Sequence, residues 1–348
     1  MDHLHWYVLI LAVCVAGPYL LRVPPRRRRD WQYLVVGIAF VSWLLAGFTT
    51  LRSAPVQQAV APFVVAIERS GGRGTEHFLL PIARYTGTNW INTWPVPDDV
   101  DRPVPPLAQI PAAWLGGPVP MTWTRSSANG ARLPVKVTGA GREPGGCYTP
   151  IVLSITGPDD GAGDRGAPNA VRIAVSTNQP VEFVRAIAPD HRDAKEIRPV
   201  IAREYQQAEA RPASERAEEW RALLSALNAA RAPLTIEMLA GPSIDAGPVI
   251  YYFRAVRRVT PPRDPQIAIE VHGWVSRDAG GAWVAFDTVR QNRSGDAQGE
   301  DRPLAIFRVG QRMYWLTMLI GYEWVDFAID DVARGSVRRF VTAGGGGC

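Results

Sequence analysis

One histidine has neighbours that would let it act as a general base. His272 stands two residues after Glu270 and two residues before Trp274 in the segment IAIEVHGWV. Alternate residues of a β-strand share a face, so these three side chains lie on one side of a strand over 267–275. A carboxylate next to an imidazole can orient it for proton transfer. The commoner interpretation of this pattern is a polar strand face in contact with solvent, and we expect that arrangement.

The chain contains no complete motif of a known catalytic or cofactor-binding site. It lacks a P-loop, a G-x-G-x-x-G turn and an H-E-x-x-H helix, and GPSID at 241–245 lacks the final glycine of a nucleophile elbow. The neighbouring carboxylates Asp330 and Asp331, or Glu323 with Asp326, are more typical of strand ends than of a glycosidase pair. We therefore expect no catalytic residue and no cofactor, with a hydrolase using His272 as an alternative.

The potential metal ligands are dispersed along the chain. His77, His191 and His272 show no metal-ligand spacing. The aspartates of GPDDGAGDRGAPN, at 157–169, lack the ligand spacing of an EF-hand and indicate a solvated loop. We expect no metal site.

The three cysteines do not form a redox or haem motif. Cys14 lies in an apolar run, Cys147 in a glycine-rich turn, and Cys348 is the last residue after four glycines. Outside the cytoplasm Cys147 and Cys348 could form a disulfide. Both could equally be free thiols.

Four tryptophans flank a segment that is rich in proline. Eight prolines lie between residues 95 and 120, which excludes a long helix or strand there and predicts an extended ribbon. The flanking residues are Trp90, Trp94, Trp114 and Trp123. They could stack on sugars of a cell-wall glycan, or anchor the ribbon to a partner protein. The alternative that we rank first is that they pin the ribbon to its own domain.

The elements that must position these residues are mainly β-strands. Alternating or continuous apolar runs bounded by turn residues predict seven strands before residue 190. They cover 63–68, the two arms of a hairpin over 77–95, 133–138, 149–156, 171–174 and 181–187. A helical period follows over 194–210 and 212–231, where Trp220, Leu223, Leu224 and Leu227 form one apolar stripe.

The C-terminal third has the pattern of an antiparallel meander. Strands over 267–275 and 282–289 flank the turn DAGG, strands over 303–309 and 312–319 flank Gly310-Gln311, and 324–332 alternates again. The fold class that we expect is α+β, mainly antiparallel β in a sandwich or partly open barrel, with a two-helix insertion.

The predicted domain boundaries follow from these changes of pattern. We expect a membrane hairpin over 1–51, a β-rich region over 52–190 that includes the ribbon at 95–120, and a helical segment over 191–232. A C-terminal meander over 233–343 and a flexible tail over 344–348 complete the chain.

The N-terminal segment has the length and composition of two membrane helices. Leu4–Leu21 and Trp31–Phe48 contain no charged residue, and each approaches the roughly 20 residues that a spanning helix needs. Between them, 22–30 carries the run Arg26, Arg27, Arg28 and Arg29. Short loops rich in arginine stay in the cytoplasm, so the N-terminus and everything after Phe48 should face outward.

The net charge does not indicate a nucleic-acid partner. It is +5, and five arginines and two aspartates in the first thirty residues account for +3 of it. The remainder is too small for the basic face that nucleic acid requires. The arginine loop should instead contact lipid headgroups.

These observations predict a protein of a bacterial inner membrane with its large domain on the periplasmic side. The expected spans carry no aspartate, glutamate, lysine or arginine that would indicate transport. We expect a non-catalytic accessory subunit that stabilises a larger complex of integral membrane proteins. The alternatives are a periplasmic module that binds cell-wall glycan or peptide, and the hydrolase.

Overall fold

A computed structural model describes residues 60–347, except for several internal segments. Those segments are 71–75, 94–102, 116, 144–149, 159–170, 212–216, 244–248, 260–266, 295–299 and 322–323. The chain divides into two units, Met1–Gln58 and Ala59–Cys348, and the described residues all belong to the second. No helix in this described part is both long enough and apolar enough to cross a membrane. The expected spans at 4–21 and 31–48 and the arginine loop lie outside the described residues.

The second unit is mostly antiparallel β-structure, with a closed six-stranded barrel and two long helices. The barrel strands pair in the order β1-β7-β4-β5-β6-β2, and β2 pairs with β1 to close the ring. They are β1 (Phe63–Ser70), β2 (His77–Tyr85), β4 (Thr122–Ser127), β5 (Arg132–Arg142), β6 (Ile151–Thr156) and β7 (Arg172–Val175). The short strand β3 (Trp90–Asn92) extends the ring by pairing with β2, as the predicted hairpin requires.

The proline-rich segment helps to fill this barrel. All six strands contribute to one buried apolar cluster, which is therefore the barrel interior. Ile110, Trp114 and Leu115 belong to the same cluster. Ile110 directly follows a short 3-10 turn, η1 (Leu107–Gln109), and the other two residues lie in a single helical turn, α3 (Ala112–Leu115). These are the only helical turns that the described part of the ribbon forms.

Two further five-stranded sheets follow along the chain. The outer sheet has the order β13-β12-β11-β10-β9, and the middle sheet has the order β17-β16-β15-β14-β8. The outer strands are β9 (Arg185–Ala186), β10 (Thr235–Gly241), β11 (Ile250–Val259), β12 (Ile267–Arg277) and β13 (Trp283–Ser294). The middle strands are β8 (Glu182–Phe183), β14 (Glu300–Val309), β15 (Arg312–Ile320), β16 (Trp324–Ala333) and β17 (Ser336–Gly347).

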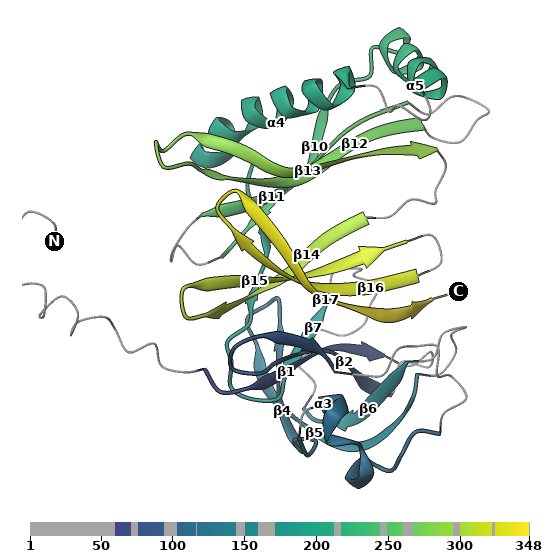
Figure 1. Cartoon of the computed structure of the whole chain (residues 1–348), viewed down its shortest axis with the longest axis vertical. Helices are drawn as coiled ribbons and strands as arrows, with labels where there is room; N and C mark the ends of the chain where they lie inside the picture. Colours follow the sequence, from purple (N-terminus) through teal and green to yellow (C-terminus); the bar gives the residue numbers. More distant parts are fainter. Residues whose placement is uncertain are drawn as a thin grey trace, which may run out of the picture. The chain divides into compact units, whose positions relative to one another are not determined.

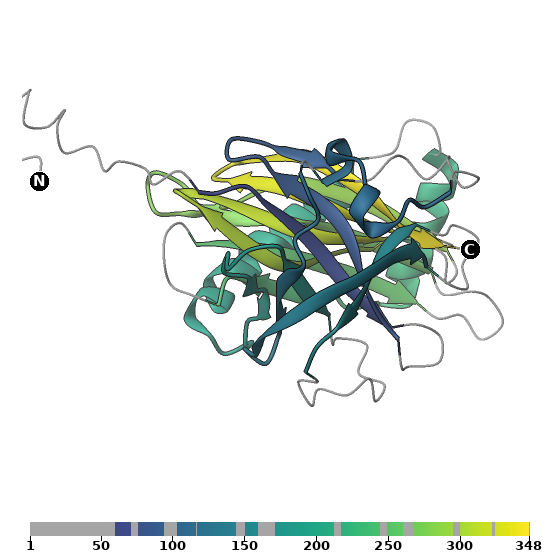
Figure 2. The same ribbon diagram turned by 90° about the horizontal axis from the view of Figure 1, so that it is seen from below.

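The middle sheet is covered on both faces (Figure 1). Phe307, Leu316 and Ile329 pack against the outside of the barrel, whereas Ile306 and Trp315 pack against the outer sheet. Burial on both faces explains why β14 and β15 read as almost continuous apolar runs rather than as alternating ones. Figure 2, seen from below, shows the barrel in front of the two sheets.

Two helices cover the remaining face of the outer sheet (Figure 1). They are α4 (Arg192–Ala210) and α5 (Ala217–Ala229). Ile197 and Ile201 of α4 and Leu227 of α5 are fully buried against the strands, as the predicted apolar stripe requires. The order of layers is therefore helices, outer sheet, middle sheet and barrel.

The structure differs from the sequence-based expectations in three places. Strand β4 was not expected, because TWTRSS has few aliphatic residues. Strands β8 and β9 share one predicted strand at 181–187, but β8 joins the middle sheet and β9 joins the outer one. The glycine run expected as a flexible tail belongs to β17, where Gly347 lies opposite Trp324 of β16.

Candidate binding cavity between the middle and outer sheets

A cavity of about 260 Å³ lies between the middle and outer sheets. Seven strands supply its lining, three from the outer sheet and four from the middle one. The lining residues are Tyr252, His272, Gly273, Trp274, Asp287, Val289, Asp301, Thr317, Asp330, Val337 and Arg339. Asp287, Val289 and Arg339 are exposed, whereas the histidine, the threonine and Asp330 are buried, so the cavity has a mouth and a floor.

The predicted histidine cluster lies at this cavity, but it does not face solvent. Glu270, His272 and Trp274 do share one face of β12, and each is at most 5% exposed. The expectation of a solvated strand face is therefore wrong, because the middle sheet covers that face. Glu270 Oε1 lies 3.2 Å from Nδ1 of His272, which fixes the orientation of the imidazole.

Aromatic side chains build the apolar part of the cavity wall. The Trp274 ring packs edge-on against Trp315 of the middle sheet, with 4.7 Å between ring centroids, and against Tyr252 at 5.3 Å. The Tyr252 hydroxyl donates to the backbone carbonyl of Asp301 at 2.9 Å. The two sheets are therefore held together directly beside the cavity.

Thr317 and an ion pair supply polar groups from the middle sheet. The Thr317 hydroxyl is buried and has no hydrogen-bond partner among the described residues. Beside it, Arg339 donates from Nε to Asp330 Oδ1 at 2.8 Å and from Nη2 to Oδ2 at 3.3 Å. A fork of this kind is among the stronger charge-assisted contacts in proteins. A buried hydroxyl without a partner costs folding free energy, so its presence in a cavity points to a ligand.

A β-bulge aims Asp287 at the mouth of the cavity. The pairing of β12 with β13 shifts register between His272 and Trp274, so that Gly273 alone opposes Asp287 and Thr288. A Cβ at Gly273 would lie 3.0 Å from the carbonyl oxygen of Asp287 and from Cα of Thr288. Asp287 itself has φ 48°, a left-handed conformation that is uncommon for residues other than glycine. Bulges and strained residues of this kind often re-aim side chains at functional sites.

The cavity lining carries more carboxyl groups than basic groups, so its negative charge is only partly balanced. Burial raises the pKa of the Asp301 carboxyl; His272 and Arg339 oppose this shift, whereas Asp330 and Glu270 add to it. Burial acts against the charge of Arg339, but the hydrogen bond and attraction of Asp330 outweigh it and raise the pKa of this guanidinium. The guanidinium of Arg339 therefore holds its proton more firmly than usual, whereas Asp301 is a carboxyl that takes up a proton more readily than usual.

The tryptophans proposed as partner contacts are largely internal. Trp90, Trp114 and Trp123 are 2%, 9% and 1% exposed, and Trp94 lies outside the described residues. Trp90 packs between the barrel and the middle sheet, and the other two belong to the barrel interior. Indoles buried in this way have little surface left for a partner or a sugar, so their placement favours a role in pinning the ribbon to its own domain.

The other sequence candidates are not brought together. Cys147 and Cys348 lie outside the described residues. His77 lies beside Glu68 in the barrel and His191 at the start of α4, so neither reaches His272. Within the described part of the chain, no group of three or more His, Cys, Asp or Glu side chains could hold a metal ion.

The adjacent carboxylates Asp330 and Asp331 also separate. Asp330 points into the cavity, whereas Asp331 lies 3.6 Å from Arg312 Nη1 and does not line the cavity. Neighbouring residues of a strand point to opposite faces, so these two cannot act as a catalytic pair.

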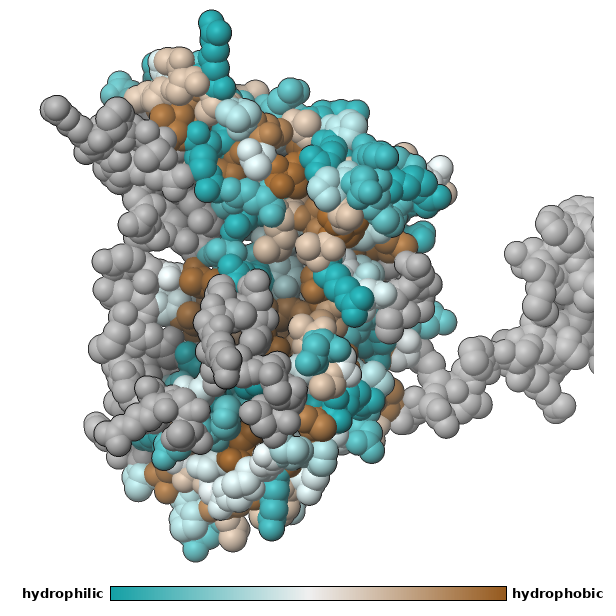
Figure 3. Space-filling view, turned by 180° about the vertical axis from the view of Figure 1, so that it is seen from behind, coloured by the Kyte–Doolittle hydropathy of each residue, from teal (hydrophilic) through white to brown (hydrophobic). Residues whose placement is uncertain are grey.

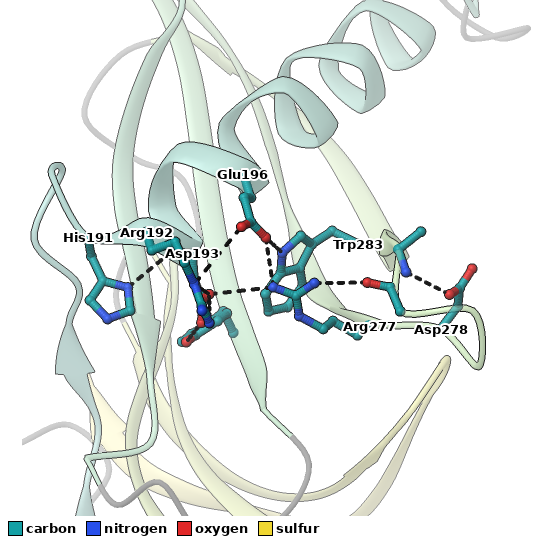
Figure 4. Close-up of polar contacts among 10 residues, drawn as sticks. His191, Arg192, Asp193, Glu196, Arg277, Asp278 and Trp283 are labelled. Carbon is teal, nitrogen blue, oxygen red and sulfur yellow. Dashed lines mark hydrogen bonds and ion pairs between the residues drawn. The ribbon is translucent and has the colours of Figure 1, made fainter.

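A second polar cluster holds the start of α4 on the β12–β13 hairpin (Figure 4). Glu196 accepts hydrogen bonds from Arg277 Nη2 at 2.7 Å and from the Trp283 indole at 2.9 Å. The Tyr251 hydroxyl donates to Asp193 Oδ2 at 2.8 Å, and the Arg277 guanidinium stacks over the Trp283 ring. Every polar group here has a partner from a neighbouring element, so we interpret the cluster as a clamp between helix and sheet rather than as a ligand site.

Several cavity residues were not singled out in the sequence. Asp301, Thr317 and Arg339 come from three different strands. Thr317 is an isolated polar residue in an apolar run, whereas Asp301 and Arg339 have charged neighbours in the sequence. The signal that the sequence did contain was a polar residue in the middle of a predicted buried strand. Thr317 within MYWLTML is the clearest example.

Comparison of the chain with known proteins identified no relative. No protein-family model, no curated protein and no solved structure matches the chain.

Proposed function

We propose that this protein is a membrane-anchored binding module that takes a small polar ligand in the cavity between its middle and outer sheets. The observation that carries the proposal is the buried Thr317 hydroxyl, which has no partner among the described residues and lines a cavity of about 260 Å³. Ligand sites are typically concavities with aromatic walls and a few convergent polar groups. Trp274 and Tyr252 supply such walls here, and the carboxylates and His272 supply the polar groups.

The anchor and the orientation belong to the same proposal. The apolar segments at 4–21 and 31–48 and the run Arg26–Arg29 support a hairpin with a cytoplasmic turn in a bacterial inner membrane. The ligand would then be a periplasmic molecule, and fragments of cell-wall glycan or peptide are the class to test first. Arg27→Cys, in a chain whose Cys14, Cys147 and Cys348 are replaced by serine, should not react with an impermeant thiol reagent added to intact cells. Labelling from outside would contradict this topology.

The exposed surface gives less support to an accessory-subunit function. Large docking surfaces are usually contiguous apolar patches. Among the described residues the exposed large apolar side chains are Ile91, Met121, Val284, Val289 and Trp324. Only Val284 and Val289 share an element, the strand β13. Over the coloured residues, Figure 3 shows hydrophobic and hydrophilic side chains interspersed. Purification in mild detergent with mass spectrometry of co-purifying chains tests the accessory function, and stoichiometric membrane partners would favour it over the binding module.

Calorimetric titration of the full chain in detergent micelles tests the binding proposal. We expect soluble cell-wall fragments to bind, and Thr317→Val to weaken this binding because it removes the unpaired hydroxyl while keeping the shape of the side chain. Asp331→Asn is the matched control, since this residue lies outside the cavity. Equal affinity of the wild type and of Thr317→Val would remove the cavity from the proposal.

The His272–Glu270 pair supports a hydrolase as a second candidate. The 3.2 Å contact orients the imidazole, and Asp301 with its raised pKa is a carboxyl that could donate a proton. Turnover of chromogenic esters, phosphoesters and glycosides by the wild type, lost in His272→Gln, is the expected result for this candidate. Retention of the full turnover rate in His272→Gln would exclude His272 from the chemistry.

A further inference from the structure

The cavity carries more acidic than basic groups. Its lining includes the carboxyl groups of Asp287, Asp301 and Asp330 but only one guanidinium, that of Arg339. The imidazole of His272 already contacts the buried carboxylate of Glu270 behind it. Even with the histidine protonated, the negative groups at the cavity outnumber the positive ones.

One of the three carboxylates is already neutralised within the protein. The guanidinium of Arg339 forms its fork with Asp330, and both hydrogen bonds lie within 3.3 Å. Asp287 and Asp301 form no ion pair with any residue that the structure describes. Burial raises the pKa of the Asp301 carboxyl. His272 and Arg339 oppose this shift, whereas the like charges of Asp330 and Glu270 add to it. Two carboxylates therefore remain for a ligand.

The remaining groups of the wall are compatible with positive charge. The rings of Trp274 and Tyr252 line the cavity, and an aromatic face attracts a cation by about 0.5–2 kcal/mol, depending on how far the cation is desolvated. The Thr317 oxygen is buried and unpaired, so it can accept a hydrogen bond from an N–H group. Carboxylates, an aromatic wall and a hydroxyl acceptor are together suited to an ammonium or guanidinium group.

A bare metal ion fits this arrangement less well than an organic cation. Metal ligands must converge on one point at about 2–2.6 Å. No set of three or more suitable ligands converges in this way in the described part of the chain. The acidic groups instead lie at different depths of the cavity, with Asp287 exposed at the mouth and Asp330 buried. A small anion would meet mostly negative charge.

We propose that the cavity selects a small organic cation, such as an amino sugar or a diamine, whose ammonium group lies between Asp301, Asp287 and the aromatic wall. This inference rests on the proposed binding function and names the charge class of its ligand. His272 then lies at the floor of the site, and Glu270 lies behind the imidazole.

Calorimetric titration of the full chain in detergent micelles with matched pairs of probes tests this inference. Glucosamine is paired with N-acetylglucosamine, and cadaverine with 1,5-pentanediol, so that the members of each pair differ in positive charge. We expect the cationic members to bind at least about tenfold more tightly than the neutral ones, which is the effect of one charge-assisted hydrogen bond. Their affinity should also fall as sodium chloride is added, because the mouth is exposed to solvent.

Variants locate the site. Asp301→Asn should weaken binding of glucosamine or cadaverine by at least about tenfold. Asp331→Asn should leave it unchanged, and circular dichroism confirms that both variants are folded. If Asp301→Asn fails to fold, two other measurements test the site. They are the salt dependence of cation binding by the wild type and the loss of cation affinity in Thr317→Val.

Three outcomes overturn the inference. Neutral probes that bind as tightly as the cationic ones would contradict selection for positive charge while leaving the binding function standing. Binding of uncharged cell-wall fragments without binding of any cationic probe would likewise contradict the inference and leave the binding function standing. Absence of binding by every probe and every fragment would contradict both the inference and the proposed function.

Discussion

Glu68 shows how this fold stabilises a charge inside the barrel. Its carboxylate is 2% exposed and lies 3.2 Å from Arg125 Nη1, 3.5 Å from Arg172 Nη1 and 3.1 Å from His77 Nδ1. Burial raises the pKa of Glu68, although both arginines and His77 oppose the shift. The two guanidiniums are themselves only 6% exposed, so removal of the carboxylate would leave buried positive charge without its partner.

Glu68→Gln should therefore lower the free energy of unfolding by about 3–5 kcal/mol, as expected when one member of a buried ion pair is removed. Urea denaturation followed by circular dichroism measures this change. Arg312→Gln is the control, because this arginine is 61% exposed and its pair with Asp331 should contribute less than about 1 kcal/mol. A loss of similar size in both variants would contradict the argument from burial.

The clamp at the start of α4 makes stability depend on pH. Burial acts to raise the pKa of Asp193, but hydrogen bonds from Tyr251 and Arg192 outweigh it and hold this pKa below its usual value of 3.8. A carboxyl whose pKa is lower in the folded state stabilises the fold above the unfolded-state pKa. That contribution is lost as the pH falls through the folded-state pKa.

Asp193→Asn should thus lower the free energy of unfolding by about 1.5–3 kcal/mol at neutral pH, because it removes hydrogen bonds to a charged group. The difference between the wild type and the variant should shrink as the pH falls below 3.8, where the wild-type carboxylate also takes up its proton. Urea denaturation at a series of pH values measures this difference. A difference that stays constant down to the lowest pH would show that the charge of Asp193 does not stabilise the helix.

At the scale of elements, the proline-rich segment is part of the barrel core. A chain with prolines at this density cannot form sheet or a long helix, but it can place single side chains. Pro111 lies immediately before α3, where its fixed φ favours the start of a helical turn. That turn inserts Trp114 into a cluster that contains Trp123, Val135 and Leu153 of the barrel strands.

Trp114→Ala should destabilise the protein by about 3–5 kcal/mol, since it removes a large buried ring and leaves a cavity. Met121→Ala, at a position that is 48% exposed, should change the free energy of unfolding by less than about 0.5 kcal/mol. Chemical denaturation of both variants provides the comparison. If Trp114 instead contacts a partner, its substitution would weaken that association and leave the stability of the isolated chain unchanged.

At the scale of the whole unit, the middle sheet couples the other layers. Its strands contribute to one buried cluster with the barrel and to another with the outer sheet. The strands β8 and β9 precede the helices in sequence but belong to the two C-terminal sheets. The regions that the sequence divides at 190 and 232 are thus one compact unit of the structure.

We expect this unit to unfold in a single cooperative transition, because neither the barrel nor the outer sheet can lose the middle sheet without exposing a core. Leu316→Ala lies on the barrel side of the middle sheet, and Ile269→Ala lies on the helix side of the outer sheet. Each should lower the midpoint of this one transition and reduce the free energy of unfolding by about 2–5 kcal/mol. Coincident transitions by circular dichroism and tryptophan fluorescence are the expected result. Two separate transitions, each sensitive to only one variant, would show that the layers fold independently.

Most of the local structure follows from short stretches of the sequence. The alternation in IAIEVHGWV correctly separated two faces of β12, and the turns at 278–281 and at Gly310 were visible because their residue types require them. The apolar period of 212–231 likewise identified the buried side of α5. These features depend on neighbours within a few residues, so the sequence contains them directly.

The surroundings of each strand face, in contrast, depend on contacts between distant parts of the chain. Whether Glu270 and His272 contact solvent or another sheet depends on strands that lie about thirty to seventy residues later in the chain. The cavity depends on this even more strongly, because Asp287, Asp301, Thr317 and Arg339 come from four strands that meet only when the two sheets stack. Burial and electrostatic surroundings are properties of such long-range contacts, and a local pattern of residue types does not specify them.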